Sequence, residues 1–368
     1  PDDDVVCHIS AKNENVLKFY EVKDWSISKR YKSKAQDRDF KLEGKGKFDH
    51  YMLKEIYEQP TLIRGLLDYY LNGDGSDVLK DSIKTIPNRV NMTACGTAFY
   101  AGLVIKNFIE TKMRIPCSAE LASEFRYKNP ILRDDEVGLF ISQSGETADT
   151  LAAQSLCKES GLDSISILNV DGSTLFREST KNLLIRAGIE IGVASTKAFT
   201  QQVLTGHLYA SGLHGDLEDQ KNTKQLIDKY TLLAARIDDL LDNTDGIKKI
   251  AQEIYNLNGF IFTGRGIYFP VALEGALKLK EIAYVHAEGY ASGELKHGPI
   301  ALIDENMVNI AIVGPELIEK TVSNIEEVRA RKGKIVVIGP KDDSKLQDIS
   351  DFFIPLNFDG LDELSPLY

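Results

Sequence analysis

Short apolar segments alternate along the chain with longer segments in which apolar residues recur at helical spacing. In the first half, strands are predicted at NRVNMTA, EVGLFIS, SISILNV and LLIRAG. Helices are predicted between them, at GTAFYAGLVIKNFIE, ETADTLAAQSLCKES and STKAFTQQVLTGHLYASGL. Apolar strands separated by amphipathic helices are typical of a parallel sheet that is covered by helices on both faces.

The same pattern returns in the second half of the chain. GFIFTGRGIYFPVALEGALKLKEIAYV has the form of RVNMTACGTAFYAGLVIKNFIE, a strand followed by a glycine turn and a helix. Further on, NMVNIAIVG, KIVVIGP and DFFIPLN correspond to EVGLFIS, SISILNV and LLIRAG. We therefore predict an α/β protein with two tandem doubly wound, flavodoxin-like parallel-sheet domains.

The first fifty residues differ in character from the rest. VVCHIS and VLKFYEV, joined by AKNEN, predict an antiparallel hairpin within residues 1–30. Residues 31–50 are rich in charged residues and are predicted to be a linker. We assign residues 51–215 to the first domain with its entry helices, where Pro60 is expected to break a helix. Residues 216–250 would form a helical connection, and residues 251–368 the second domain.

Composition narrows the class of protein. Hydrophobic residues make up 43% of the chain and charged residues 27%, as in globular proteins. A net charge of -11 argues against nucleic acid and anionic membranes as partners, because both need basic patches. No apolar run approaches the roughly 18 residues of a membrane span, and no signal peptide is visible.

The cysteines and glycines favour neither a metal site nor a bound cofactor. Cys7, Cys95, Cys117 and Cys157 lie far apart without a C-x-x-C spacing, so no zinc site or disulfide framework is predicted. This usage fits a reducing cytoplasm. FTGRGIYF lacks the third glycine and the later acidic residue of a dinucleotide site.

The segment ISQSGETADT places several neutral donors where a buried strand gives way to a helix. A helix N-terminus favours an anion, and the side chains of Ser142, Gln143, Ser144 and Thr147 would add donors around it. This pattern favours a phosphate monoester over the alternative, in which Ser and Thr merely cap the helix. The TACGTAFY turn lies near enough in such a sheet to share the ligand, whereas AIVGPE in the second copy lacks the hydroxyls.

A second cluster of reactive groups lies in EGALKLKEIAYVHAEGYASGELKHGP. At 100° per residue, Glu274, Lys278 and Glu281 fall within about 60° of one another on one helix face. Such a row is commonly a solvated set of ion pairs. Alternatively, it supplies a base and a cation for an enolate, with His297 nearby as a proton shuttle. For His297 itself, a structural or surface role is the other reading.

Five segments carry a resemblance to a known family: ACGTAFYAGLV, AELASEFRY, SQSGETADTL, EIGVASTKAFTQQ and ALEGALKLKEIAYVHAEGYASGELKHGP. Together they resemble the isomerase part of glutamine-fructose-6-phosphate aminotransferase (isomerizing), or glucosamine-6-phosphate synthase, which consists of two sugar-isomerase (SIS) domains. The resemblance runs from about Phe48 to the end. The hairpin resembles the last strands of the family's glutaminase domain, whose catalytic cysteine this chain lacks.

The resemblance assigns substrate contacts to individual residues. It implies that the sugar phosphate binds at Thr97, Ser142, Gln143, Ser144 and Thr147. It also implies that Val193 and Ser195 meet the sugar hydroxyls. Ala98 stands where the family usually has serine, so one phosphate donor is missing.

The resemblance also implies catalytic roles. Glu281 would move a proton between C1 and C2 of the sugar, with Lys278 stabilising the enolate-like charge. His297 would assist ring opening by reaching into the site of a partner subunit in a homodimer. Glu274 receives no role. The family's tail lysine, which forms a Schiff base with the sugar, has no counterpart before the chain stops at SPLY, so we interpret the chain as a fragment.

The function implied is the isomerase domain of the cytoplasmic enzyme that makes glucosamine 6-phosphate from fructose 6-phosphate and glutamine-derived ammonia, the first step towards UDP-N-acetylglucosamine. Fructose 6-phosphate, glucose 6-phosphate or glucosamine 6-phosphate, the glutaminase domain of the same polypeptide and a second subunit are the implied partners. No cofactor, metal, nucleic acid or membrane is expected. The alternatives are a SIS-type sensor that binds without turnover and a SIS isomerase for another phosphosugar.

Overall fold

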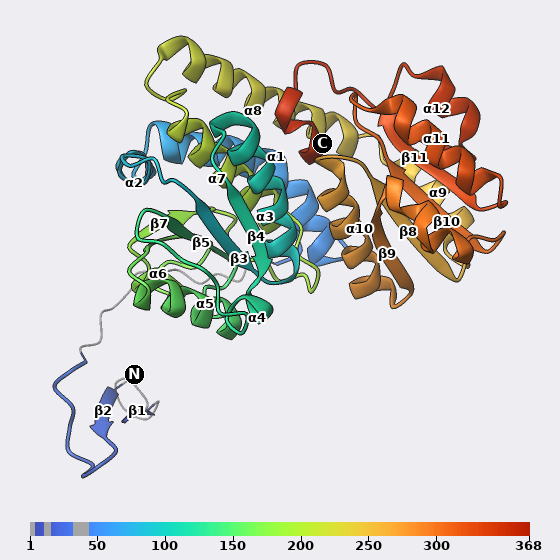
Figure 1. The fold of residues 1–368 in the computed structure, drawn as a ribbon. Helices are drawn as coiled ribbons and strands as arrows, with labels where there is room; N and C mark the ends of the chain where they lie inside the picture. Colours follow the sequence, from blue (N-terminus) through green and yellow to red (C-terminus); the bar gives the residue numbers. More distant parts are fainter. Residues whose placement is uncertain (1–3, 11–15, 32–43) are drawn as a thin grey trace. The chain divides into compact units, whose positions relative to one another are not determined.

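The structure is a computed structural model that describes residues 4–10, 16–31 and 44–368. It divides into two compact units, Pro1–Gly46 and Lys47–Tyr368, and each is treated by itself (Figure 1). Most of the predicted linker, residues 32–43, lies outside the described residues, as does the AKNEN connection at residues 11–15.

The smaller unit contains the predicted hairpin. Strands β1 (Val5–Ser10) and β2 (Val16–Glu21) pair antiparallel, with Val5 opposite Glu21. Arg30 lies 2.8 Å from the carboxylate of Asp4 and also contacts Glu21, so a salt bridge joins the open end of the hairpin to the segment after it.

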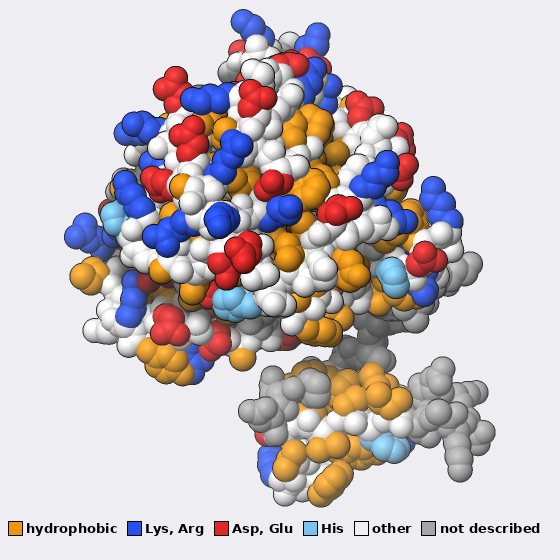
Figure 2. All heavy atoms as spheres, turned by 90° about the vertical axis from the view of Figure 1, so that its right-hand side faces the viewer, with side chains coloured by type: hydrophobic (Ala, Val, Ile, Leu, Met, Phe, Trp, Pro, Cys, Tyr) orange, Lys and Arg blue, Asp and Glu red, His pale blue; other side chains and the backbone are white. Residues whose placement is uncertain are grey.

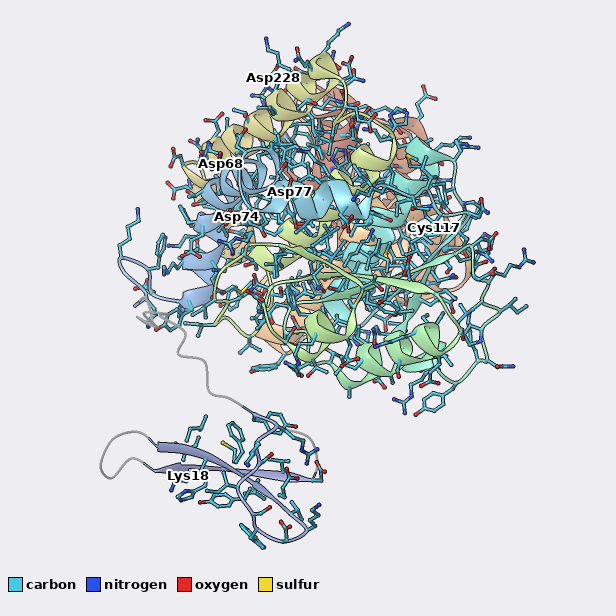
Figure 3. The ribbon with its side chains drawn as sticks, turned by 90° about the vertical axis from the view of Figure 1, so that its left-hand side faces the viewer. Lys18, Asp68, Asp74, Asp77, Cys117 and Asp228 are labelled. Carbon is cyan, nitrogen blue, oxygen red and sulfur yellow. The ribbon has the colours of Figure 1, made fainter. Side chains whose placement is uncertain are left out.

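The larger unit begins with two helices, α1 (Tyr51–Leu71) and α2 (Gly75–Ser82). Asp68, Asp74 and Asp77 mark the region where α1 ends and α2 follows (Figure 3). The expected break at Pro60 is wrong, because α1 continues through it. Pro60 leaves the carbonyl of Ile56 without its usual N–H donor, and Nε2 of Gln59 donates to that oxygen instead, at 3.2 Å.

The first sheet has five parallel strands in the order β4-β3-β5-β6-β7. Its strands are β3 (Val90–Ala94), β4 (Cys117–Leu121), β5 (Val137–Ser142), β6 (Asp163–Leu168) and β7 (Lys181–Leu184). Its helices are α3 (Gly96–Phe108), extended by a π-turn at Ile109–Met113, α4 (Ala122–Phe125), α5 (Ala148–Glu159), α6 (Thr174–Glu178) and α7 (Lys197–Leu213). The edge strand β4 was not predicted.

The second sheet repeats this topology, with its five parallel strands in the order β9-β8-β10-β11-β12. These strands are β8 (Gly259–Gly264), β9 (His286–Ala291), β10 (Met307–Ile312), β11 (Lys334–Pro340) and β12 (Phe352–Leu356). The helices are α10 (Tyr268–Ala283), α11 (Ile318–Arg329) and α12 (Ser344–Ile349). In both sheets the second strand in chain order lies outside the first, which confirms the predicted repeat of one doubly wound unit.

Two helices connect the sheets, α8 (Gln220–Leu241) and α9 (Asp245–Ile254), and α8 packs against α1. They fall largely within the segment predicted to be a helical connection; the domain boundaries themselves remain a prediction. Three short 3-10 turns complete the unit, at Ser292–His297, Pro299–Leu302 and Asp362–Leu367.

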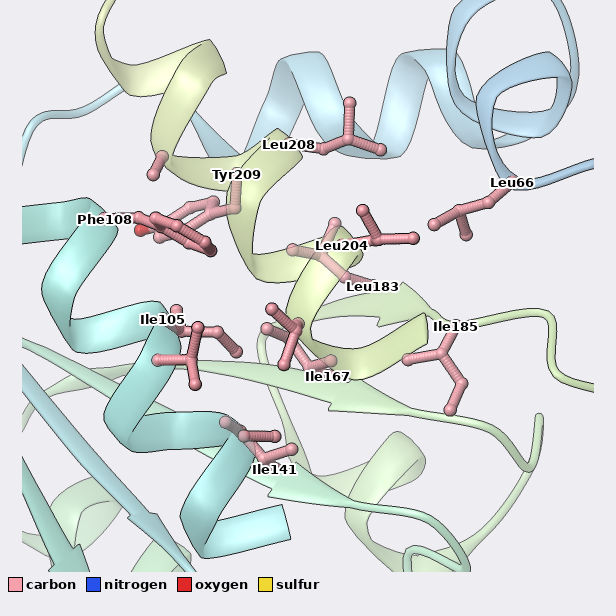
Figure 4. Packing of buried hydrophobic residues seen from close by; sticks show 14 of the residues in the cluster. Leu66, Ile105, Phe108, Ile141, Ile167, Leu183, Ile185, Leu204, Leu208 and Tyr209 are labelled. Atoms are coloured by element: carbon pink, nitrogen blue, oxygen red, sulfur yellow. The ribbon is translucent and has the colours of Figure 1, made fainter. Parts of the chain in front are cut away.

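The first sheet is buried on both faces, which explains its nearly continuous apolar strands. Alternate side chains of one strand enter different cores: Ile141 faces α3 and α7, whereas Phe140 joins a cluster with α4 and α5. Figure 4 shows the larger core, in which strand residues meet side chains of both helices. Its members include Ile105, Phe108, Ile141, Ile167, Leu183, Leu204 and Leu208.

The exterior carries mixed charge. Acidic and basic side chains are interspersed over the face that Figure 2 shows. Within the described ranges, no helix has both the length and the apolar character needed to cross a membrane.

Candidate functional site

The hydroxyl-rich turn begins at the end of β5, beside β3, where the strand order of the first sheet reverses. This is the edge at which open α/β sheets bind ligands. Ser142 is buried, and its Oγ accepts a hydrogen bond from the backbone N–H of Gly145 at 3.0 Å. Ser144 Oγ likewise accepts from the N–H of Glu146 at 3.2 Å. Both side chains therefore stabilise the backbone conformation of the turn.

Gly145 has a structural reason to be glycine. Its φ is +69°, and a Cβ there would lie 2.1 Å from Ser173 Oγ. Its carbonyl accepts from the N–H of Leu175 at 3.0 Å, and Glu146 accepts from the N–H of Thr174 at 2.8 Å. The α6 region thus holds the turn against the sheet.

The start of α5 differs from the alternative in which Ser and Thr merely cap the helix. Thr147 occupies the N-cap position, but its side chain accepts no capping hydrogen bond from the described residues. Its Oγ1 lies 3.4 Å from Ser142 Oγ. Hydroxyl groups at a helix N-terminus that do not cap the helix are available to an anion.

At the neighbouring strand-helix junction, between β3 and α3, a residue of the first copy contacts a helix of the second. Thr97, in the first turn of α3, donates from Oγ1 to Oε1 of Glu274 at 3.0 Å. Oγ1 of Thr97 in turn accepts a hydrogen bond from Nζ of Lys278 at 2.9 Å. Helices α3 and α10, which occupy equivalent positions in the two copies, pack against one another here. Thr97, which was predicted to bind the phosphate, therefore contacts α10, the helix that carries the predicted catalytic residues.

The helical row on α10 is a connected ion-pair set. Lys278 Nζ lies 2.7 Å from Glu281 Oε2 and 3.2 Å from Glu274 Oε1. The side chains of Glu274 and Lys278 are only 8% and 15% exposed, and that of Glu281 is 33% exposed. The alternative prediction, a row of solvent-exposed ion pairs, is wrong for Glu274 and Lys278, because both side chains lie against α3. The more accessible end of the set is Glu281.

Burial dominates the electrostatics of Glu274. It raises the pKa of this carboxyl from 4.5 to about 7, although Lys278 and the hydrogen bond from Thr97 act in the opposite direction. Oε2 of Glu274 is buried and accepts no hydrogen bond within the described residues. Sequence reasoning gave Glu274 no role, because its burial depends on the contact between the two copies.

The GVAST segment lies in the loop between β7 and α7. Val193 is 88% exposed. Ser195 Oγ donates to Oε2 of Glu190 at 2.8 Å, while Oε1 of Glu190 accepts from the N–H groups of Thr196 and Ala198 at 2.9 and 3.2 Å. Glu190 was not singled out from the sequence, since a carboxylate just before a helix has many ordinary explanations.

His297 stands apart from these contacts. It is the last residue of the 3-10 turn Ser292–His297, is exposed, and makes no hydrogen bond or ion pair with the described part of the chain. The structure therefore does not bring it to Glu281 within this chain. Nor do the described residues contain a group of three or more His, Cys, Asp or Glu side chains able to hold a metal.

Comparisons with known proteins agree with this fold. The family model "SIS domain" matches residues 86–212 and 253–358. Glutamine-fructose-6-phosphate aminotransferase (isomerizing) of Chlorobaculum tepidum is 44% identical over 339 residues, which cover 88% of this chain and 54% of that relative. The C-terminal domain of glucosamine-fructose-6-phosphate aminotransferase from Francisella tularensis is 38% identical, with a TM-score of 0.79, covering 88% of this chain and 93% of that one.

A more distant structure shares only the fold. Tagatose-6-phosphate ketose/aldose isomerase from Escherichia coli matches with a TM-score of 0.70 at 18% identity, over 87% of this chain and 91% of that chain. The fold and the family model define the class, proteins with two SIS domains in tandem. Within it, this chain belongs to the family of the C-terminal domain of glucosamine-fructose-6-phosphate aminotransferase. It spans about half the length of the curated relatives it matches.

Proposed function

We propose that this chain is the sugar-phosphate isomerase part of an enzyme that makes glucosamine 6-phosphate from fructose 6-phosphate and glutamine-derived ammonia. The observation that carries the proposal is the contact of the α10 ion-pair set with Thr97, beside the hydroxyl-rich turn of the first sheet. A base and a cation adjacent to a phosphate-binding edge are the parts that a ketose-aldose isomerisation needs.

In this proposal the phosphate group binds at the hydroxyl-rich turn. Ser142, Gln143, Ser144 and Thr147 surround the N-terminus of α5, where hydroxyl donors and the helix dipole favour an anion. Thr97 completes the set, although its hydroxyl hydrogen is directed to Glu274 in the structure described. The loop with Val193 and Ser195 contacts the sugar hydroxyls.

The proposed chemistry is a proton transfer between neighbouring carbons. The Glu281 carboxylate removes the proton from C1, an enediolate forms, and the same group returns the proton to C2, while a hydroxyl proton moves from O1 to O2. Lys278, whose ammonium lies 2.7 Å from Glu281, is close enough to the base to stabilise the negative charge that develops on the oxygen. His297 assists ring opening from a partner subunit in a homodimer.

The proposal extends to partners and compartment. Ammonia comes from a glutaminase domain of the same polypeptide, to which the β1–β2 hairpin would belong. The reaction uses no cofactor, and we place the protein in the cytoplasm. The four free cysteines, Cys7, Cys95, Cys117 and Cys157, are compatible with a reducing compartment.

Proton NMR in heavy water tests the proposed function. Fructose 6-phosphate is incubated with the wild-type chain and with Glu281→Gln, and the carbon-bound protons and the formation of glucose 6-phosphate are followed. We expect exchange or conversion with the wild type and its loss in the variant. Glu110→Gln is the matched control, because Glu110 also lies 2.7 Å from a lysine on the same helical segment, Lys106.

Each other outcome has a definite meaning. Line broadening of the sugar signals without exchange would contradict the isomerase and favour a sensor that binds without turnover. Exchange that persists in Glu281→Gln would assign the base to another residue. If neither broadening nor exchange occurred, the proposed substrate would be wrong.

A further inference from the structure

A buried carboxylate on α1 holds the loop that precedes α7. Glu55 is 2% exposed, and its Oε1 accepts from the backbone N–H groups of Ile191 and Gly192 at 2.6 and 3.1 Å. Its Oε2 lies 3.2 Å from the same N–H of Gly192. Hydrogen bonds to a charged acceptor are stronger than neutral ones, so this contact fixes the backbone of the loop.

A second carboxylate holds the other side of the same loop. Glu190 accepts from the Ser195 hydroxyl and from two N–H groups at the start of α7. Because Ser195 donates its only hydrogen to Glu190, its oxygen faces any further partner as an acceptor. A sugar hydroxyl can donate to such an oxygen, whereas a second acceptor cannot bind there.

We propose that Glu55 and Glu190 are positioning residues that together give this site its preference for a sugar phosphate over inorganic phosphate. The inference rests on the proposed function, in which the loop with Val193 and Ser195 meets the sugar. Glu55 sets the path of the loop backbone, and Glu190 sets the direction of the Ser195 hydroxyl. The hydrogen bonds of both carboxylates within the described residues go to this loop and the start of α7, and not to the turn proposed to bind the phosphate.

The glycine in this loop follows from the same arrangement. A Cβ on Gly192 would lie 2.5 Å from Oε2 of Glu55 and 3.3 Å from the backbone of Met52. Any side chain at residue 192 would therefore push the loop away from the carboxylate that holds it. Gly192→Ala should reproduce the effect of removing the Glu55 carboxylate.

Other contacts between α1 and α7 do not depend on Glu55. Lys197 is 5% exposed at its side chain and pairs with Glu58 at 2.7 Å, and Thr200 donates to Gln59 at 2.6 Å. These contacts join the two helices one turn further along α1. Replacing Glu55 should therefore change the loop while the helices stay packed.

Calorimetric titration with two ligands tests this inference. Fructose 6-phosphate and inorganic phosphate are each titrated into the wild-type chain, Glu55→Gln, Glu190→Gln and Gly192→Ala. We expect the three variants to bind fructose 6-phosphate about tenfold more weakly, the effect of losing one charge-assisted hydrogen bond. Their affinity for inorganic phosphate should stay within about twofold of the wild type.

The matched control is Glu136→Gln. Glu136 is also a buried carboxylate, 7% exposed, and it accepts from Nδ2 of Asn91 at 2.7 Å at the opposite end of the first sheet. We expect it to bind both ligands as the wild type does. The control separates loss of the loop contact from the loss of a buried charge.

Two results would overturn the inference. Wild-type affinity for fructose 6-phosphate in Glu55→Gln and Glu190→Gln would show that the carboxylates do not position the loop. An equal loss for both ligands would assign them a general structural role. If Glu55→Gln failed to fold, Glu190→Gln and Gly192→Ala would decide by the same criteria. A wild type that binds fructose 6-phosphate no more tightly than phosphate would instead contradict the proposed function.

Discussion

The two sheets have the same topology but differ at the edge where such sheets bind ligands. In the first sheet, this edge carries the hydroxyl-rich turn and the open N-terminus of α5. In the second, the ring of Tyr268 occupies the corresponding space beside Gly314. A Cβ on Gly314 would lie only 1.9 Å from that ring. The hydroxyl of Tyr268 is paired with Ser365 at 2.6 Å. The Tyr268 ring thus occupies the space beside Gly314 at the second edge.

The two copies therefore share a fold, but the hydroxyl-rich turn is present only in the first. The second copy contributes in another way, because its first helix carries Glu274, Lys278 and Glu281 to the first copy. In the proposed function a complete site would therefore need both copies, and only the first has the hydroxyl-rich turn that is proposed to bind phosphate.

The largest effect is expected at the cation between the two carboxylates. Lys278→Gln leaves Glu274 and Glu281 without their shared partner and removes the charge that would stabilise an enediolate. We expect the rate of proton exchange on fructose 6-phosphate to fall by about 10² to 10³. Lys106→Gln, which breaks the comparable pair with Glu110, should keep the wild-type rate. An unchanged rate in Lys278→Gln would show that the Lys278 ammonium does not stabilise the enediolate.

Next in size is a change at the turn of the first sheet. Gly145→Ala introduces a Cβ at φ +69° and against Ser173, so we expect inorganic phosphate to bind about 10 to 100 times more weakly. Gly161→Ala is the control, since Gly161 also has a positive φ, +85°, but open space around it. Isothermal titration with phosphate measures the affinity of both variants. If Gly145→Ala bound phosphate as tightly as the wild type and Gly161→Ala, the anion would bind elsewhere.

The counterpart in the second sheet should affect stability and not binding. Gly314→Ala forces a methyl group against the Tyr268 ring, and overpacking of this kind costs about 1–3 kcal/mol of unfolding free energy. Urea unfolding measures the loss, while phosphate affinity should stay at the wild-type value. Reduced phosphate binding in this variant would mean that the second edge also serves as a site.

The smallest effect concerns the buried Glu274. Its pKa of about 7 lies above the ordinary 4.5, so between these values the folded state keeps a proton that the unfolded chain releases. The free energy of unfolding therefore falls as pH rises from about 5 to about 8. Glu274→Gln lacks this proton, and we expect it to gain on the order of 1 kcal/mol over the wild type at pH 8 and nothing at pH 5.

Urea unfolding at a series of pH values between these limits measures that difference. Glu110→Gln corrects for the loss of one carboxylate on the surface. A constant difference between Glu274→Gln and the wild type at every pH would contradict the raised pKa of Glu274.

Much of the fold follows from local pattern. Strands buried on both faces, such as β5 and β8, are apolar runs bounded by turns, and the sequence repeats their arrangement. The edge strands β4 and β9 were missed, because their partly exposed residues CSAEL and HAEGYA do not form such a run. Pro60 was misjudged, since Gln59 compensates for the hydrogen bond that proline removes.

The candidate site was only partly predictable. The donors of the hydroxyl-rich turn are neighbours in sequence, and the residues of the α10 set are spaced so that they share one helix face. Each group could therefore be recognised from a single segment of the sequence. Their meeting was not visible, because Thr97 and Lys278 are 181 residues apart. Glu55 was missed for the same kind of reason: a glutamate in an amphipathic helix gives no sign that it is buried against a loop 136 residues away.

In the proposed function, the second copy completes the site of the first through Thr97. A double-mutant cycle with Thr97→Val and Lys278→Gln, read from the exchange rate of fructose 6-phosphate protons, tests it most directly. We predict that the two effects are coupled by about 1 kcal/mol or more, as expected of groups that share a hydrogen bond. Strictly additive effects would contradict the claim, because the contact between the copies would then have no part in the reaction.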